Sequence, residues 1–311
     1  MVYKERLGDS DEVGQRYLSN LIHIYARAAK ANGAKIAMKW KGGSYAPATT
    51  LTNDTGEEFD FVLGQPAFAD SVYFNCVDDK IIMMNSVKQH FNVPEYMLLN
   101  KRITVDSALS HVNKLIADVK SDITLPVIVK PNKGSRSNHV YIARDQQQLK
   151  EALQANIEDS HHGRHIIVQQ CIEDAVDVRA IVMDGECVYA KTTERFDQIT
   201  TNQDFEDLND VQVTDKTLLT RLDEAATYLL NEHGLEYAGL DFRMDKGGKL
   251  WFIEANSGPM GIDRIPEEPR ERLLAKIFDR VMAGKEEQNK YRLAQYRMCA
   301  HAKAAYVTQI T

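Results

Sequence analysis

The sequence predicts an α+β protein in which antiparallel strand hairpins alternate with helices. Asp184-Gly185 lies between two runs rich in β-branched residues, and this pair fits a tight hairpin turn. A second strand pair turns over 245–248, within the segment YAGLDFRMDKGGKLWFIEAN. Hairpins separated by helices favour packed α+β layers over one parallel sheet, so a dinucleotide-binding α/β fold is not expected.

The other elements follow from hydrophobic spacing and turn residues. A helix is expected over 11–32, because apolar residues recur at three- and four-residue steps and Asn32-Gly33 ends the run. Strands are expected at 36–40 and 59–63, joined by a loop-like stretch. Further along, the expected elements are a helix over 80–90, a strand at 96–99, a helix over 104–120, a hairpin over 125–143, a helix over 145–155, a strand at 165–172, a hairpin over 178–194, a helix over 214–232, the strand pair over 237–256 and a helical tail from 285.

Composition and charge exclude several classes of partner. The 311 residues include 38 basic and 45 acidic side chains, and a chain with a formal charge of −7 repels nucleic acid and anionic lipid. Its apolar runs fall well short of the roughly 20 residues of a membrane-spanning helix, and its first residues lack the apolar core of a secretory signal. We therefore expect a cytoplasmic protein with neither nucleic acid nor membrane as partner.

The cysteines and clustered histidines show no established metal or disulfide pattern. No CxxC pair is present. Reduced, packed thiols are expected at Cys76, Cys171, Cys187 and Cys299. His161-His162 with His165 could suggest a metal cluster, but the segment HHGRH lacks a fourth ligand at helical or hairpin spacing. The sequence favours a solvated turn there.

The most informative constellation joins the two strands of the last hairpin. Asp241 lies on the first strand, while Glu254 and Asn256 lie two apart on the second, where strand alternation turns both to one face. In a hairpin that turns near 246–248, Asp241 falls close to opposite Glu254. Two carboxylates and an amide oxygen on one face form a hard-oxygen site of the kind that Mg²⁺ favours. An exposed, merely charged sheet face is the alternative.

A second constellation is a lysine followed by a turn of small residues. Lys130 ends the VIV strand, and the segment PNKGSRSN that follows contains Gly134 with two serines and two asparagines. A cation beside several backbone N–H groups can bind polyphosphate oxygens, and glycine lets the backbone approach closely. The pattern GxxxxGK[ST] is absent, and an ordinary solvated turn is the alternative.

Short motifs follow a fixed order between residues 78 and 261. They are DDK, VPEY, VIVKPNKGS, VQQCI, DVR, LDFRMD and FIEANSGPMG. This order resembles the ATP-grasp superfamily of carboxylate–amine ligases, closest to the glutathione synthetase and ribosomal-protein glutamate ligase branch. The resemblance covers roughly residues 79–283 and implies an ATP-grasp fold with a central subdomain over 79–168 and a C-terminal subdomain over 169–283. The residue pattern itself predicts a small α/β domain over 1–78, which the resemblance does not cover, and a helical tail over 284–311.

The resemblance implies an ATP site. Two lysines match the family's phosphate contacts, the turn over 134–136 matches the loop that closes over the triphosphate, the hinge over 169–172 matches the reader of the adenine edge, and Asp177 matches the acid that holds the ribose. The implied nucleotide-binding residues are Lys80, Lys130, Gly134, Ser135, Arg136, Gln169, Gln170, Ile172, Asp177, Lys191 and Asn202.

Metal and substrate contacts are implied in the same way. Asp241, Glu254 and Asn256 match the ligands of two Mg²⁺ ions, for which Mn²⁺ can substitute. Arginines bind carboxylate and acylphosphate oxygens in bidentate fashion. The candidates are Arg179, Arg195, Arg243 and Arg264. A surface ion pair is the alternative for each of them.

The implied activity is ATP-dependent formation of an amide through an acylphosphate, with release of ADP and phosphate. Positioning and electrostatic stabilisation then do the catalytic work, because the substrate itself provides the nucleophile. The expected partners are small carboxylate and amine substrates, an amino acid or peptide, and a homo-oligomer is left open. A catalytically silent ATP-binding module and an ATP-grasp kinase are the alternative functions.

Overall fold

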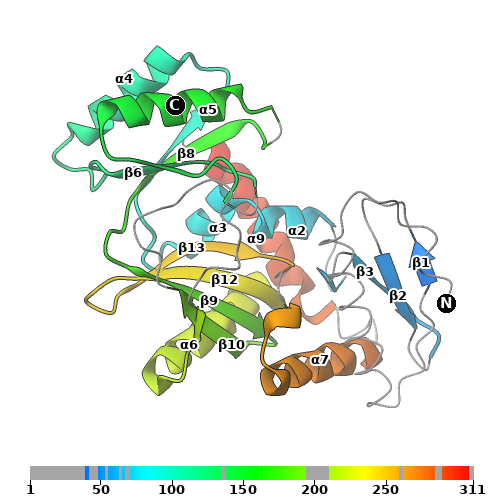
Figure 1. Ribbon diagram of the computed structural model, residues 1–311. Helices are drawn as coiled ribbons and strands as arrows, with labels where there is room; N and C mark the ends of the chain where they lie inside the picture. Colours follow the sequence, from blue (N-terminus) through cyan, green and yellow to red (C-terminus); the bar gives the residue numbers. More distant parts are fainter. Residues whose placement is uncertain are drawn as a thin grey trace, which may run out of the picture.

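Antiparallel sheets flanked by helices form the framework of the chain (Figure 1), which confirms the expected α+β class. The structure is a computed structural model, and it describes residues 39–41, 48–52, 55–62, 65–66, 71–134, 137–160, 162–193, 210–258, 262–283 and 289–307.

The described strands form three sheets. The small sheet has the order β1 (Lys39–Lys41), β2 (Ala48–Thr52), β3 (Glu58–Val62), β4 (Gln65–Pro66). The middle sheet has the order β5 (Tyr96–Asn100), β8 (His165–Gln170), β6 (Val127–Pro131), β7 (Tyr141–Ala143). The five-stranded sheet has the order β11 (Asp210–Gln212), β10 (Glu186–Thr193), β9 (Val176–Met183), β12 (Tyr237–Met244), β13 (Leu250–Asn256).

Helices connect and cover the larger sheets. They are α2 (Ser71–Val77), α3 (Lys80–Val87), α4 (Val105–Ile116), α5 (Gln146–Glu158), α6 (Lys216–His233), α7 (Glu267–Met282) and α9 (Arg292–Val307), with short 3₁₀ turns η2 (Ile262–Arg264) and η3 (Asn289–Tyr291). In Figure 1, α4 and α5 lie above the middle sheet at the top of the view, and α6 and α7 lie below the five-stranded sheet. Helix α3 lies between the two sheets and packs on β13.

Local sequence signals explain where the helices begin. Asp79, Asp145 and Asp215 precede α3, α5 and α6, and each carboxylate accepts a hydrogen bond from the backbone N–H three residues on, at 3.1, 2.8 and 2.7 Å. Such caps satisfy donors that the first helical turn leaves unpaired. The predicted hairpin turn is also confirmed, because Asp184 and Gly185 both have positive φ, 53° and 75°, as a primed turn requires.

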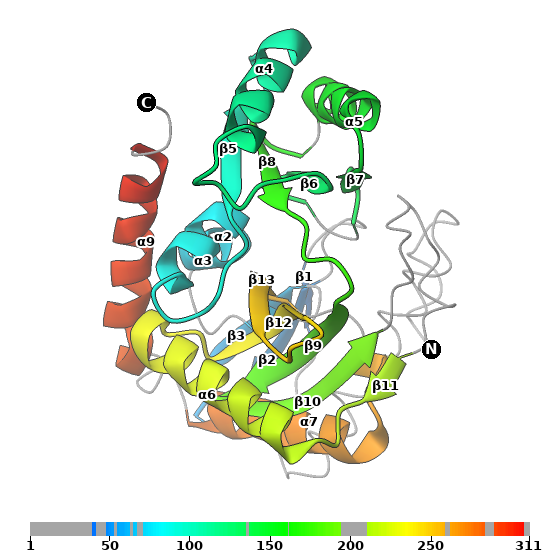
Figure 2. The same ribbon diagram turned by 90° about the vertical axis from the view of Figure 1, so that its left-hand side faces the viewer.

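Strand alternation divides the five-stranded sheet into two faces. On β9, Val178 and Ala180 belong to the core that α6 covers. Asp177 and Arg179, which alternate with them along the strand, therefore turn to the opposite face. This opposite face looks towards α3 and the middle sheet (Figure 2).

The largest core crosses elements that are far apart in sequence. It includes Tyr73 of α2, Met83 of α3, Phe252 of β13 and Met298 of α9. Helix α9 contacts α2, α3 and α6 (Figure 2), so the expected C-terminal tail helix is packed into the molecule. A second core lies between the middle sheet, α4 and α5.

Several expected elements differ from the structure. The loop-like stretch expected between the strands at 36–40 and 59–63 contains β2. Of the strand expected at 36–40, the structure describes only the last residues, which belong to β1. The sequence pattern gave no expectation of α2, β11 or α7. The helix expected over 11–32 lies outside the described residues. Among the residues that are described, no helix is both long enough and apolar enough to cross a membrane.

Candidate functional site

Two carboxylates and one amide meet on the β12–β13 hairpin. Asp241 pairs with Glu254 in the strand register, as the sequence predicted, and a bulge follows at once because Phe242 pairs with Phe252. The extra residue keeps Glu254 on the face of Asp241 while both phenylalanines face the core. The Asn256 amide Nδ2 donates to Asp241 Oδ2 at 2.8 Å and to Glu254 Oε1 at 3.4 Å. The three predicted metal ligands are therefore adjacent.

Two cations contact these carboxylates. Lys80, on the first turn of α3, places Nζ 3.0 Å from Glu254 Oε2. Arg179, on β9, places Nη1 3.3 Å from Asp241 Oδ1. Arg179 was predicted only as a substrate contact, and its pairing with Asp241 comes from the antiparallel register of β9 and β12.

Lys130 adds a third cation from the middle sheet. Burial lowers the pKa of Lys130 to about 8; nearby Glu254 raises it and nearby Lys80 lowers it. The pKa of Glu254 is lowered: its burial acts to raise the pKa, but Lys80, Lys130 and the Asn256 hydrogen bond together outweigh it. The carboxylate at the centre of the site is thus held ionised by cations from two different parts of the fold.

The turn of small residues after β6 is hydrogen-bonded to the start of α3. Lys80 Nζ donates to the carbonyl of Gly134 at 3.1 Å, and the Ile81 N–H donates to Asn132 Oδ1, also at 3.1 Å. A side chain at Gly134 would press on His162, because a Cβ there would lie 3.2 Å from the ring. Glycine therefore allows a close approach at this point. Ser135 and Arg136, also predicted here, lie outside the described residues.

The other predicted arginines are placed differently. Arg243 points Nε at Asp177 Oδ1 at 3.2 Å, and its Nη2 donates to the Ala175 carbonyl at 3.1 Å. The predicted ribose acid is therefore paired with a predicted substrate arginine. Arg264 lies exposed in η2.

Three further predicted residues lie on β10 or beyond its end. Lys191 forms an ion pair with Asp210 across the β10–β11 pairing. Arg195 and Asn202 lie outside the described residues.

The predicted hinge residues lie at the end of β8. Gln169 is buried and directs its Nε2 to the Met84 sulfur at 3.2 Å. The side-chain oxygen of Gln170 accepts from the Glu95 backbone N–H at 3.2 Å, and Ile172 is buried just beyond the strand. Their role at the adenine edge stays a prediction.

Sequence reasoning missed a clamp on the loop that follows the metal ligands. Asp78 accepts from both the backbone N–H and the hydroxyl of Ser257, each at 3.0 Å. These two residues are 179 apart in sequence, so no local pattern could reveal the contact. The clamp fixes the chain immediately after Asn256.

The clustered histidines lie around the turn between α5 and β8, where Gly163 and Arg164 are exposed as expected of a solvated turn, but His162 also has a buried partner. His162 contacts the buried Asp159, and its Nδ1 lies 3.0 Å from Asp159 Oδ2. His165 belongs to β8, and His161 lies outside the described residues. Of the four cysteines expected to be packed, Cys76 and Cys187 are buried, whereas Cys171 and Cys299 are only partly buried.

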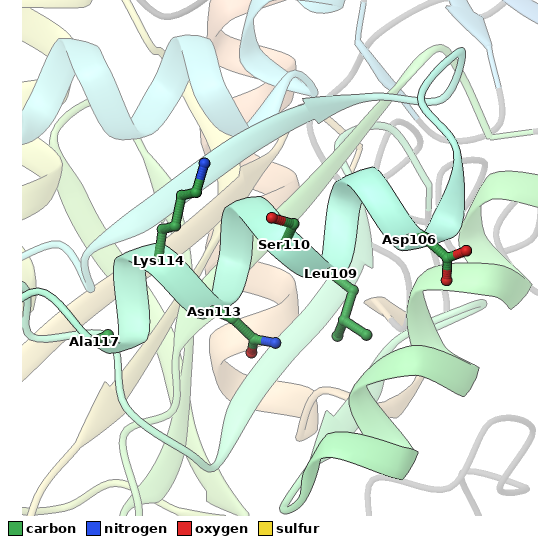
Figure 3. Close-up of a pocket in the computed structure, with 6 residues that line it drawn as sticks. All are labelled: Asp106, Leu109, Ser110, Asn113, Lys114 and Ala117. Carbon is green, nitrogen blue, oxygen red and sulfur yellow. The ribbon is translucent and has the colours of Figure 1, made fainter.

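A hollow along α4 is distinct from the predicted site in its lining. Its volume is about 540 Å³, and its lining residues follow one helix surface (Figure 3). They are Asp106, Leu109, Ser110, Asn113, Lys114 and Ala117. None of these residues belongs to the predicted ATP or metal set.

Comparison with known proteins identifies the family. A family model described as a RimK-like ATP-grasp domain matches residues 79–279. An uncharacterised protein of Mycoplasma pneumoniae, the MG012 homolog, is 26% identical over 200 residues, which cover 63% of this chain and 66% of that protein. The uncharacterised protein MG012 of Mycoplasma genitalium is 30% identical over 145 residues, covering 45% of this chain and 46% of that protein. The chain thus spans between about half and two thirds of these relatives.

Solved structures share the fold. The D-alanine–D-alanine ligase from Bacillus anthracis superposes with a TM-score of 0.55 at 17% identity, over 72% of each chain. The D-Ala:D-Ser ligase VanG from Enterococcus faecalis gives a TM-score of 0.51 at 16% identity, over 66% of this chain and 61% of that one. The family match extends over more than half of the sequence and includes every described residue of the Asp241–Glu254–Asn256 constellation. The chain belongs to the RimK-like ATP-grasp family.

Proposed function

We propose that the chain is an ATP-dependent ligase that joins a carboxylate to an amine. One observation carries the proposal most directly: Lys80 from α3 and Lys130 from the middle sheet converge on the acidic face of β12 and β13. A triphosphate is a compact polyanion, and a net-acidic chain can hold it only where positive groups are gathered locally. Family membership supports the same reading.

The oxygen ligands on the hairpin suit Mg²⁺. Asp241, Glu254 and Asn256 provide two carboxylates and one amide on a single face, and carboxylates together with substrate phosphates are the usual Mg²⁺ ligands. The Asn256 amide presents its nitrogen to both acids, so coordination through Oδ1 requires the amide to turn over. Bound there, Mg²⁺ would neutralise charge on the phosphoryl oxygens.

In the proposed reaction the substrates supply the reacting groups. An oxygen of the acid substrate attacks the γ-phosphorus, and ADP leaves with the electrons of the broken P–O bond. The amine nitrogen then attacks the acyl carbon, phosphate leaves, and the amine proton passes to solvent. Both steps develop negative charge on oxygen, and fixed cations such as Lys80 and Lys130 stabilise that charge.

We propose that Arg179, Arg243 and the Asp78 clamp position the acid substrate. Arg179 and Arg243 lie on neighbouring strands of the site face, and both are already aimed by carboxylates, Asp241 and Asp177. The Asp78 clamp holds Ser257 at the end of β13. We propose that an amino acid or peptide binds beside these groups.

The test measures ADP release with pooled substrates. Purified chain, MgATP and pools of amino acids and short peptides are mixed, with Glu254→Gln as the matched inactive control. We expect ADP above the control only when a carboxylate and an amine are both present. ATP binding with no ADP from any pool would favour a silent module. ADP formed with an alcohol acceptor and no carboxylate would favour a kinase.

A further inference from the structure

Two loops meet beside the small-residue turn through a buried aspartate and two histidines. Asp159 follows α5, His162 lies three residues further on, and His139 lies in the turn that leads into β7. One ligand atom from each residue lies within 4.8 Å of the other two. The Asp159 side chain is 1% exposed, and those of His139 and His162 are 35% and 22% exposed.

We propose that His139, Asp159 and His162 bind one divalent transition-metal ion of the zinc class. Two imidazoles and a carboxylate match the three protein ligands of open zinc sites, where solvent or another ligand takes the fourth position. Three atoms no more than 4.8 Å apart all lie within about 2.8 Å of a common centre, so they need to close by about 0.7 Å to reach zinc bond lengths of about 2.0–2.2 Å.

His139 turns one ring nitrogen to the carboxylate. Its Nε2 lies 4.0 Å from Asp159 Oδ1, which is too long for a hydrogen bond, and the two atoms need to approach to the roughly 3.4 Å that separates two ligands of a tetrahedral zinc ion. The other ring nitrogen, Nδ1, is buried with no hydrogen-bond partner among the residues that the structure describes. Because Nδ1 lies on another side of the ring, an ion on Nε2 leaves Nδ1 to a water molecule.

The carboxylate is already oriented by its neighbours. Lys101 Nζ donates to Asp159 Oδ2 at 2.8 Å and to the Asp159 carbonyl at 2.7 Å, and the His162 N–H donates to the same Oδ2 at 3.2 Å. These contacts leave Oδ1 on the side of His139. Lys101 also offsets the carboxylate charge, so we expect micromolar rather than nanomolar affinity for the metal.

An ion at this place would join two loops of the central subdomain. His162 lies on the turn after α5, and its ring faces Gly134 of the turn after β6. None of the three ligands belongs to the set proposed for ATP or Mg²⁺. The metal site therefore does not depend on the proposed ligase activity.

The experiment titrates the full chain with Zn²⁺ against a chromogenic chelator, without nucleotide and in excess Mg²⁺ to occupy oxygen-only sites. His139→Asn and His162→Gln remove single ligands. Asparagine tolerates the positive φ of residue 139, which is 56°, so this variant keeps the backbone. His111→Gln, on the exposed surface of α4, is the matched control. The visible spectrum of added Co²⁺ reports coordination independently.

We expect one Zn²⁺ per chain, unchanged in His111→Gln and weakened about tenfold or more in each ligand variant. The Co²⁺ absorption should weaken in the same two variants. No saturable Zn²⁺ binding would overturn the proposal. Binding that both ligand variants retain at full strength would also overturn it, and the cluster would then be an ion-paired group centred on Asp159 and Lys101.

Discussion

Two ion-pair systems at β12 differ in how far solvent reaches them. Just before the strand, Glu236 Oε1 meets Arg280 Nε at 2.8 Å, and their side chains are only 2% and 8% exposed. Further along the strand, Asp241 meets Arg179 at 3.3 Å with 22% and 31% exposed, and Asn256 reaches the same carboxylate. The first pair is sealed from solvent, whereas the second belongs to a partly exposed cluster.

This difference separates stability from function. A buried pair costs desolvation and becomes strongly destabilising when one partner is removed. A partly exposed pair contributes little to stability, because solvent screens it. The charges beside Asp241 and Glu254 are therefore better explained by a ligand than by the fold. Substitutions in the Glu236–Arg280 pair should lower stability more than activity, and substitutions beside Asp241 should lower activity more than stability.

The largest effect on stability is expected from Arg280→Met. The change leaves Glu236 buried without its partner, so the free energy of unfolding should fall by about 3–5 kcal/mol at pH 8. Urea unfolding measures it. Lys276→Met is the control, because Lys276 lies one turn earlier on α7 and its pair with Glu186 is more exposed; it should cost no more than about 1 kcal/mol. Equal losses of unfolding free energy in both variants would show that burial of the Glu236–Arg280 pair makes no difference to its contribution.

The same pair gives a pH dependence. Burial raises the pKa of Glu236 to about 7 from an ordinary value of 4.5, although Arg280 opposes the rise. Between these values the folded chain holds a proton that the unfolded chain has released, so this group's contribution to stability falls as the pH rises. Without Arg280 the pKa rises further. The loss in Arg280→Met should therefore be smaller at pH 6 than at pH 8, and a larger loss at pH 6 would contradict this.

The largest effect on activity is expected from Asp241→Asn. Carboxylate-dependent and amine-dependent ADP release should fall about 10²–10³-fold, as on loss of one electrostatic group at a reacting phosphoryl. Stability should change by no more than about 1 kcal/mol, because the Arg179 pair is partly exposed. A variant that is several kcal/mol less stable but whose folded fraction keeps the full specific activity would assign Asp241 to structure.

A smaller effect is expected from Asp78→Ala. The change removes the acceptors for two hydrogen bonds from Ser257, next to the predicted ligand Asn256. ADP release should fall about tenfold, which corresponds to about 1.4 kcal/mol. Asp78→Asn keeps one acceptor and should recover part of the rate. Steady-state assays of both variants, with a substrate pair identified in the pooled ADP-release test, decide the point.

The smallest effect concerns a thiol in the packed part of the sheet. Burial raises the pKa of Cys187 to about 12, with Asp223 adding to the rise. Because the thiolate is the reactive form, Cys187 should resist alkylation at pH 8 in the folded chain and react after unfolding. Mass spectrometry of the labelled peptides measures this. Labelling of native Cys187 at the unfolded rate would show that this region opens to solvent.

Local signals allowed much of this arrangement to be predicted. The Asp184-Gly185 turn and the pairing of Asp241 with Glu254 follow from turn chemistry and strand alternation, which act over a few residues. Lys80 and Lys130 were predicted because they stand in the motifs DDK and VIVKPNKGS. Their convergence on Glu254 was expected only through the family resemblance.

Long-range contacts escaped the sequence pattern for a physical reason. The Arg179–Asp241 pair, the Asp78–Ser257 clamp and the grouping of His139 with Asp159 depend on which strands and loops become neighbours. No spacing rule encodes that choice, since it is made by packing of the cores. Strand β2 was missed because its segment is rich in threonine and lies between glycines, which is typical of loops as well.

Calorimetric titration of the full chain with MgATP tests the proposed ATP site. Lys130→Met removes the buried cation with little change of volume, and Lys133→Met removes a half-exposed lysine of the neighbouring turn as the control. We expect one ATP per chain and an affinity at least about tenfold weaker in Lys130→Met than in Lys133→Met. No saturable binding to the unmodified chain, or equal affinity in the two variants, would contradict it.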